Sequence, residues 1–163
     1  MSSQVLSPQA SHAVLAAWVR LLHAHAASTR ELSAQLQNEH GLTINDYEAL
    51  LHLSRAEHGA MRRIDLAGEL LLTPSGVTRL LDGLEAAGHV CKGSCPSDGR
   101  VTYAVLTDAG RKKLQQASCS HIAAVTELFQ ERFSDDELAT LAELLGRLPG
   151  AAGDGQECSP GRE

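Results

Sequence analysis

The sequence predicts a mostly helical fold that contains one small β-hairpin. Hydrophobic residues make up 43% of the 163 residues and aromatic residues only 3%. Most of the apolar side chains are Leu and Ala, a composition that favours packed helices over sheets. Apolar residues recur at helical spacing along most of the chain, and they alternate as in strands only within residues 89–107. A chain of this length is expected to form a single domain.

The first predicted element is one long helix, from Ser11 to Asn38. Steps of three and four residues place seven positions on one side of it: Leu15, Trp18, Leu22, His25, Thr29, Leu32 and Leu36. At 1.5 Å per residue this helix would be roughly 40 Å long. A helix that long in so small a domain usually packs against another subunit. Residues 10–40 are therefore predicted to be an N-terminal dimerisation helix.

Three shorter helices are predicted next. The first has Thr43 as its N-cap and ends near Gly59. The second covers residues 64–71. The third begins at Thr73-Pro74, where a capping residue precedes a proline at the first helical position, and Gly88 ends it.

A β-hairpin follows these helices. Its predicted strands are residues 89–92 and 101–107, and residues 93–100 form a turn-rich loop between them. Two consecutive short helices followed by a strand, a loop and a strand have the order of a winged helix-turn-helix. The sequence places this DNA-binding domain at residues 41–110.

Two helices are predicted to close the fold, capped by Thr107 and by Ser134. The first is expected to bury Leu114, His121, Val125 and Leu128. Residues 111–148 are interpreted as C-terminal dimerisation helices. The stretch 149–163 is rich in Gly, Pro, Ser and acidic residues and is predicted to be a disordered tail.

The third short helix carries the candidate functional residues. Its polar face presents Ser75, Thr78 and Arg79, which would read base edges in a major groove, and an arginine can contact guanine O6 and N7 together. Gly76 would let the backbone approach DNA closely, and Arg100 in the hairpin loop would probe a minor groove. The remaining candidates lie beside this helix or in the hairpin: Thr73, Ser97 and Asp98, with Arg62, Arg63 and Lys92 as phosphate contacts.

The net charge of −6 is unusual for a protein that binds nucleic acid, but the charge is unevenly distributed. Residues 61–113 contain eight Lys and Arg against six Asp and Glu, whereas the rest of the chain contains six against fourteen. The basic residues therefore concentrate in the predicted winged helix. This bias alone does not separate a DNA-binding surface from a solvated one.

Several stretches together resemble the signature of the MarR family. They are residues 84–92 (Leu-Glu-Ala-Ala-Gly-His-Val-Cys-Lys), Asp98-Gly99-Arg100, residues 106–110 (Leu-Thr-Asp-Ala-Gly) and, before them, residues 73–81 (Thr-Pro-Ser-Gly-Val-Thr-Arg-Leu-Leu). In helix order the resemblance covers about residues 10–148. Two positions depart from the family pattern, since Lys92 stands where Arg is usual and His89 where a bulky apolar residue is usual.

The resemblance implies a homodimer that binds pseudo-palindromic double-stranded DNA. It implies a transcriptional repressor that a small phenolic or anionic effector releases from DNA. By resemblance, residues 74–87 are the recognition helix, and Asp98 orients Arg100 in the wing. The alternatives on the same fold are a protein-interaction module and a regulator that senses metal or thiol redox state.

A smaller set of residues is considered for the effector. His25 and Thr29 interrupt the apolar side of the first helix, and a pocket there would be completed by Trp18, Tyr47 and His52. The alternative is that these side chains are ordinary members of a helix interface or of the core.

Other functional classes find little support in the sequence. No phosphate-binding glycine loop, nucleophile elbow or metalloprotease motif is present, so neither an enzyme nor a cofactor is expected. The pairs His23/His25 and Cys119/His121 lie two residues apart, which separates them on a helix, and no metal site is predicted. Redox sensing by Cys95 or Cys119 stays open. With no secretory signal or membrane span visible, the chain is expected to be cytoplasmic.

Overall fold

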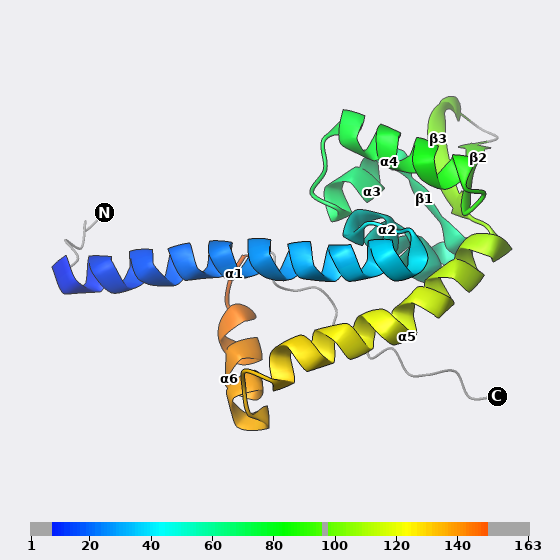
Figure 1. Cartoon of the computed structure of the whole chain (residues 1–163). Helices are drawn as coiled ribbons and strands as arrows, with labels where there is room; N and C mark the ends of the chain where they lie inside the picture. The colour runs from blue at the N-terminus through cyan, green and yellow to red at the C-terminus, as the bar shows by residue number, and fades with distance from the viewer. Residues whose placement is uncertain (1–7, 96–97, 150–163) are drawn as a thin grey trace, which may run out of the picture. The chain divides into compact units, whose positions relative to one another are not determined.

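The computed structural model describes residues 8–95 and 98–149, with the side chains of residues 12–93 and 102–149. The chain divides into two units, Met1–Ala124 and Val125–Glu163, which are described separately. Figure 1 shows the order of the elements along the chain. Within the described residues, no helix combines the length and the apolar character needed to cross a membrane.

Helix α1 runs from Pro8 to His40, a few residues longer than predicted at each end. Its C-terminal third packs on the core through Leu36, which is fully buried, whereas most side chains of residues 12–27 are exposed. Helix α2 covers Ile44–Arg55 and begins with a complete capping box. The backbone N–H of Asp46 donates to the Thr43 hydroxyl at 3.2 Å, and the N–H of Thr43 donates to the Asp46 carboxylate at 2.8 Å.

The end of α2 differs from the prediction. The helix stops at Arg55, and a 3₁₀ turn, η1, covers Glu57–Gly59 before strand β1 begins at Ala60. Gly59 has a φ of +68°, a left-handed backbone conformation that cannot continue a right-handed α-helix. The predicted end near Gly59 is therefore a few residues late, because the chain turns into a strand that sequence reasoning did not find.

Helices α3 (Arg63–Glu69) and α4 (Pro74–Ala86) form the helix-turn-helix pair. Helix α3 is slightly shorter than predicted, since it ends at Glu69 and Leu71 adopts a left-handed conformation in the turn, with φ +51°. Helix α4 starts and stops as expected. Gly88, at φ +75°, follows its C-cap, and the N–H of His89 donates to the Leu84 carbonyl at 2.9 Å.

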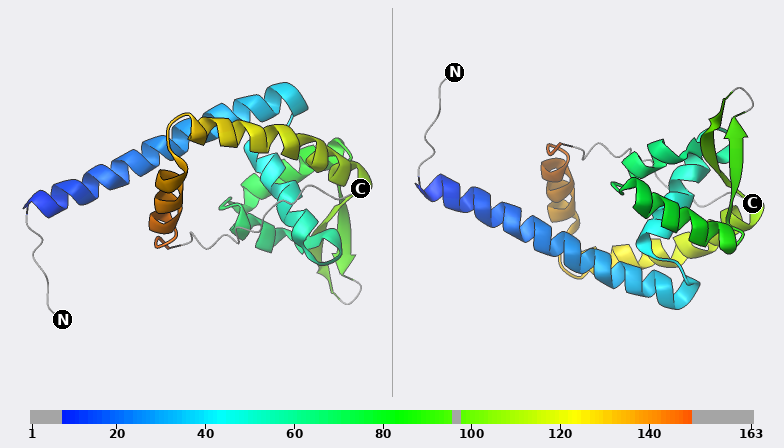
Figure 2. Two further views of the ribbon diagram at one scale, coloured as in Figure 1. Left: turned by 90° about the horizontal axis from the view of Figure 1, so that it is seen from below. Right: turned by 90° about the horizontal axis from the view of Figure 1, so that it is seen from above.

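The sheet has three antiparallel strands in the order β1-β3-β2. Strands β2 (Val90–Cys95) and β3 (Asp98–Leu106) form the predicted hairpin, but both extend into the stretch that was interpreted as loop. Figure 2 shows this hairpin extending beyond the helices of its unit. Strand β1 (Ala60–Arg62) pairs with β3, with Arg62 opposite Tyr103.

The core of the first unit lies between these helices and the sheet. Its fully buried large side chains are Leu36, Leu50, Leu53 and Leu66, contributed by α1, α2 and α3. Val77, Leu81 and Leu84 add the apolar face of α4, and Val90 and Leu106 add the base of the hairpin. The recognition candidate α4 is thus held by one buried face, which leaves its other face free for contacts.

Helix α5 covers Asp108–Gln130 and extends through both units. Thr107 caps it as predicted, since its hydroxyl oxygen accepts from the Gly110 N–H at 3.0 Å. Leu114 and His121 are buried as expected, whereas Val125 and Leu128 are only partly buried.

The second unit contains the end of α5 and helix α6, Asp135–Leu145. Ser134 and Glu137 form the predicted capping box, in which the hydrogen bonds donated by Ser134 lower the pKa of the Glu137 carboxyl. The helix ends before the predicted residue 148, and no residue of α6 is buried. Of the tail predicted to be disordered, residues 150–163 lie outside the described residues.

Candidate nucleic-acid interface

Helix α4 separates a buried apolar side from an exposed polar side, as its sequence predicts. Val77 and Leu81 are buried, whereas Ser75, Thr78 and Arg79 are exposed together with Asp82. Among the described residues Arg79 has no ion-pair or hydrogen-bond partner. Its guanidinium is therefore available for a ligand outside the chain.

Local hydrogen bonds organise the first turn of α4. The Thr73 hydroxyl oxygen accepts from the Gly76 N–H at 3.1 Å and lies 3.2 Å from the Ser75 hydroxyl. The Thr78 hydroxyl donates to the Pro74 carbonyl at 2.8 Å, so its proton is already committed to the helix. Thr78 therefore offers a methyl group and an acceptor to a base edge rather than a donor.

Packing within the protein also explains why a glycine occupies position 76. A Cβ at this position would lie 3.2 Å from the Thr73 hydroxyl oxygen and 3.6 Å from the Leu72 Cβ. The small residue thus leaves room for the cap of α4. Its predicted role in a close approach to DNA stays a prediction.

The three basic residues expected at phosphates have different surroundings. Arg62 donates through Nε and Nη2 to the two carboxylate oxygens of Asp65, at 2.6 and 2.8 Å, and this exposed pair raises the pKa of Arg62. Lys92 forms an ion pair with Glu85, with Nζ and Oε2 2.7 Å apart. Arg63 Nη2 is buried and has no hydrogen-bond partner among the described residues. Arg62 and Lys92 thus each have an acidic partner within the protein, and the phosphate contacts expected of the three residues stay a prediction.

The tip of the hairpin is described only in part. Asp98 lies in β3 opposite Cys95, next to an irregularity in the strand register, and Arg100 follows in the same strand. Ser97 and the side chains of Asp98 and Arg100 lie outside the described residues. The expectation that Asp98 orients Arg100 therefore stays a prediction.

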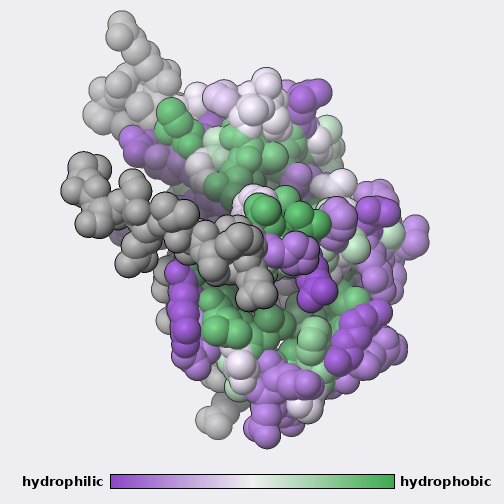
Figure 3. All heavy atoms as spheres, turned by 90° about the vertical axis from the view of Figure 1, so that its left-hand side faces the viewer, coloured by the Kyte–Doolittle hydropathy of each residue, from purple (hydrophilic) through white to green (hydrophobic). Residues whose placement is uncertain are grey.

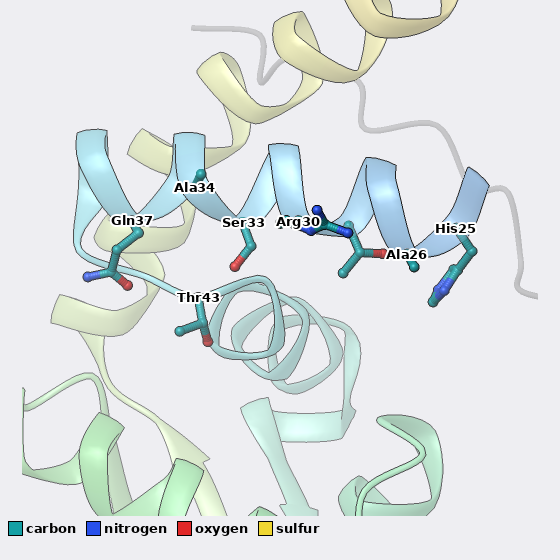
Figure 4. A pocket seen from close by; sticks show the side chains of 8 residues that line it. His25, Ala26, Arg30, Ser33, Ala34, Gln37 and Thr43 are labelled. Atoms are coloured by element: carbon teal, nitrogen blue, oxygen red, sulfur yellow. The ribbon is translucent and has the colours of Figure 1, made fainter. Parts of the chain in front are cut away.

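The structure brings together only part of the predicted effector set. His25 and Thr29 line an open groove of about 670 Å³ along α1, with Arg30, Ser33 and Thr43 among the other lining residues. In Figure 4, His25, Ser33 and Gln37 extend from the same side of α1, and Thr43 lies at the start of α2.

The other three effector candidates lie elsewhere. Trp18 is 56% exposed on α1 and is not among the residues that line the groove. Tyr47 is buried, with its hydroxyl 3.2 Å from that of Ser118 and its ring centroid 4.6 Å from that of His121. Tyr47 is thus a core residue in this structure.

A group of titratable residues links α1, α2 and α3, and sequence reasoning recognised only its histidines. Burial raises the pKa of Glu48, and the nearby His52 and His25 partly oppose this shift. His52 Nδ1 also lies 4.0 Å from a Glu69 carboxylate oxygen. The spacing of Glu48 and His52, four residues apart on one helix, was the available sequence signal.

The described residues contain no group of three or more His, Cys, Asp or Glu side chains arranged to hold a metal ion. Cys91 and Cys119 are free, exposed thiols. Redox sensing by Cys119 stays a prediction, and the side chain of Cys95 lies outside the described residues.

Comparison with known proteins places this fold and site in a family. A sequence model of the MarR family matches residues 40–101. YkoM of Bacillus subtilis (strain 168), an uncharacterized HTH-type transcriptional regulator, is 31% identical over 118 residues, which span 72% of this chain and 75% of YkoM.

Two solved structures from Streptomyces coelicolor are also similar. AbsC, a MarR family transcriptional regulator, has a TM-score of 0.72 and 31% identity, covering 88% of this chain and 93% of AbsC. Sco3205, a MarR family transcriptional regulator in complex with DNA, has a TM-score of 0.74 and 26% identity, covering 88% of this chain and 87% of Sco3205. With the exposed polar face of α4 beside a β-hairpin and relatives of this similarity, the chain belongs to the MarR family of transcriptional regulators.

Proposed function

We propose that this protein regulates transcription by binding a specific sequence in double-stranded DNA. Helix α4 would lie in the major groove, where Ser75, Thr78 and Arg79 meet base edges, and the β2–β3 hairpin would reach the adjacent minor groove through Arg100. The observation that carries the proposal is the exposed Arg79, which has no partner within the described part of the chain and lies on a helix whose opposite face is buried.

The protein is proposed to act as a homodimer on a pseudo-palindromic site. Five apolar side chains are exposed on α1 at helical spacing, namely Val14, Leu15, Trp18, Val19 and Leu22. Figure 3 shows hydrophobic side chains reaching the surface between polar ones. A second copy would remove these side chains from water and would set two recognition helices about 34 Å apart, one duplex turn.

Effector-controlled repression is the proposed mode of regulation. A dimer bound to promoter DNA would block other proteins from it, and an anionic compound in the α1 groove would meet His25 and Arg30. In a DNA titration, 4-hydroxybenzoate is expected to weaken binding by the unmodified protein and to have less effect on Arg30→Ala.

The substitution Arg79→Ala tests DNA recognition directly. A bidentate arginine–guanine contact contributes about 1–3 kcal/mol, so the affinity for the specific site should fall by about 5- to 150-fold. The measurement is a fluorescence-anisotropy titration of the protein against duplexes from its own upstream region, at a fixed salt concentration.

Arg55→Ala is the matched control, because Arg55 is also an exposed arginine but lies at the end of α2. It should leave the affinity unchanged. If the unmodified protein binds no specific duplex, the proposal is wrong. A measurable affinity that Arg79→Ala does not reduce would instead favour a protein-interaction module, which the net charge of −6 would suit.

A further inference from the structure

Three charged side chains meet where α3, α4 and the hairpin join. Arg63 is the first residue of α3, Glu85 lies in the last turn of α4, and Lys92 is on β2. All three line one small cavity of about 10 Å³, close to the minimum volume that a single water molecule requires. Only one ion pair forms among them, that between Lys92 and Glu85 at 2.7 Å.

Arg63 is the anomaly in this group. Its Nη2 is buried without a hydrogen-bond partner among the described residues, although Glu85 lines the same cavity. A buried donor with no partner is costly, and most such groups in folded proteins find one. Two cationic residues and one acidic residue therefore line the cavity, and of the two cations only Lys92 forms an ion pair within the described part of the chain.

The position of Glu85 at the end of α4 favours a cation beside it. The carbonyl groups at the C-terminal end of a helix carry partial negative charge, so a carboxylate in the last turn is unfavourable unless a cation offsets it. If Lys92 moved to a DNA phosphate, Glu85 would face both the helix end and the phosphate without a partner. Arg63 is the cation already in place to replace Lys92.

We propose that Glu85 exchanges partners when the protein binds DNA, from Lys92 in the free protein to Arg63 in the complex. The exchange rests on the proposed DNA-binding function and assigns Arg63 a different role from the phosphate contact that its sequence suggested. Arg63 is a positioning residue: it takes over the carboxylate, releases Lys92 to a phosphate and satisfies its own buried Nη2. Lys92, with its side chain 57% exposed, is the group that reaches the DNA.

A double-mutant cycle on DNA affinity tests the exchange. Arg63→Met should weaken binding of the specific duplex several-fold, because Glu85 then retains Lys92. In the Glu85→Gln background the same substitution should change the affinity by less than about twofold, since the neutral amide holds Lys92 only weakly. Glu85→Gln should thus restore most of the affinity that Arg63→Met loses.

Arg62→Met is the matched control, because Arg62 is the neighbouring arginine but is exposed and paired with Asp65. If Arg62 contacts a phosphate, its loss should persist in the Glu85→Gln background and should lower the salt dependence of log K by about one unit per contact. Circular dichroism and the melting temperature of each variant show whether the protein is folded before the titration.

The outcomes separate this proposal from the general function. Equal losses from Arg63→Met in both backgrounds would show that Arg63 itself contacts DNA and would overturn the exchange. The exchange would also be overturned if Arg63→Met caused no loss in either background while Arg79→Ala lowered the affinity for the specific duplex. Failure of the unmodified protein to bind any specific duplex would overturn the exchange and the proposed function together.

Discussion

The helical repeat of α5 predicted correctly that His121 is buried. This burial nevertheless has a free-energy cost. His121 is 9% exposed on α5 and stacks against Tyr47 at a tilt of 55°, while its Nδ1 has no hydrogen-bond partner among the described residues. Burial lowers the pKa of His121, because the low-dielectric surroundings disfavour the imidazolium form. The folded protein therefore binds this proton less readily than the unfolded chain does.

The lowered pKa of His121 makes the stability of the fold depend on pH. The contribution of neutral His121 is complete above the unfolded pKa of about 6.5 and is lost as the pH falls through that value toward the lower folded pKa. The free energy of unfolding should therefore decrease between pH 7.5 and pH 5.5, and this decrease should be smaller in His121→Leu. Urea denaturation at both pH values measures it.

His58→Asn serves as the control for this experiment. The His58 side chain is 89% exposed, and Asn tolerates its φ of +55°. The control should keep the pH dependence of the unmodified protein. An unchanged pH dependence in His121→Leu would show that other groups are responsible.

At the scale of elements, the junction between the hairpin and α5 is tightly constrained. The Thr107 hydroxyl donates toward the carbonyls of Gly88 and His89, at 2.7 and 3.0 Å, and the same oxygen caps α5. A Cβ on Gly110 would lie 2.0 Å from the His89 carbonyl oxygen and 2.8 Å from Leu106 Cδ1. The first turn of α5 therefore approaches the start of β2 at a distance that only glycine allows.

Gly110→Ala is accordingly predicted to destabilise the fold. The backbone of His89 must move to relieve the contact, and overpacking of this kind costs about 1–3 kcal/mol or more. Gly83→Ala is the opposite case, because a Cβ on Gly83 would meet nothing within 4 Å. Since alanine favours the helical conformation more than glycine does, this substitution within α4 should stabilise the protein by about 0.5–1 kcal/mol. Thermal denaturation of both variants gives the comparison, and equal melting temperatures would contradict it.

At the scale of the whole molecule, each unit leaves apolar surface uncovered by its own residues. In the first unit the exposed fractions on α1 range from 46% for Leu22 to 62% for Leu15. In the second unit, α6 has no buried residue, and Leu144 is 50% exposed. Apolar patches of this kind mark association surfaces.

The corresponding prediction is that Leu15→Glu with Leu22→Glu converts the dimer to a monomer. Two carboxylates in the apolar strip of α1 would lose their hydration on association without gaining partners. Sedimentation equilibrium measures the mass, and the Trp18 emission reports the exposure of the same face. Ala24→Glu, about 180° around α1 from Leu15, should remain dimeric. A monomeric unmodified protein would contradict the prediction.

The elements that the sequence predicted are those whose signals are local. Thr43, Thr73, Thr107 and Ser134 all cap helices as expected, because a cap depends only on residues within one turn of it. The two faces of α4 were predictable for the same reason, since burial followed the helical repeat of Val77, Leu81 and Leu84.

The rest depended on residues that are distant along the chain. Strand β1 has only three residues, too few to show an alternating pattern, and it exists because β3 pairs with it across more than forty positions. The local sequence of Arg63 and Lys92 indicates only two cations. Tertiary packing turned Arg63 Nη2 inward and set Lys92 against Glu85, since α3, α4 and β2 meet at that point.

Local chemistry in the sequence thus determined the helices of this protein, their caps and the exposed polar face of α4. The tertiary structure alone decided which charges meet, and that Arg63 Nη2 is buried without a hydrogen-bond partner among the described residues. The physical reason is the separation along the chain between the residues that interact. Capping hydrogen bonds and helical repeats involve residues a few positions apart, whereas ion pairs and burial depend on how separate elements pack together.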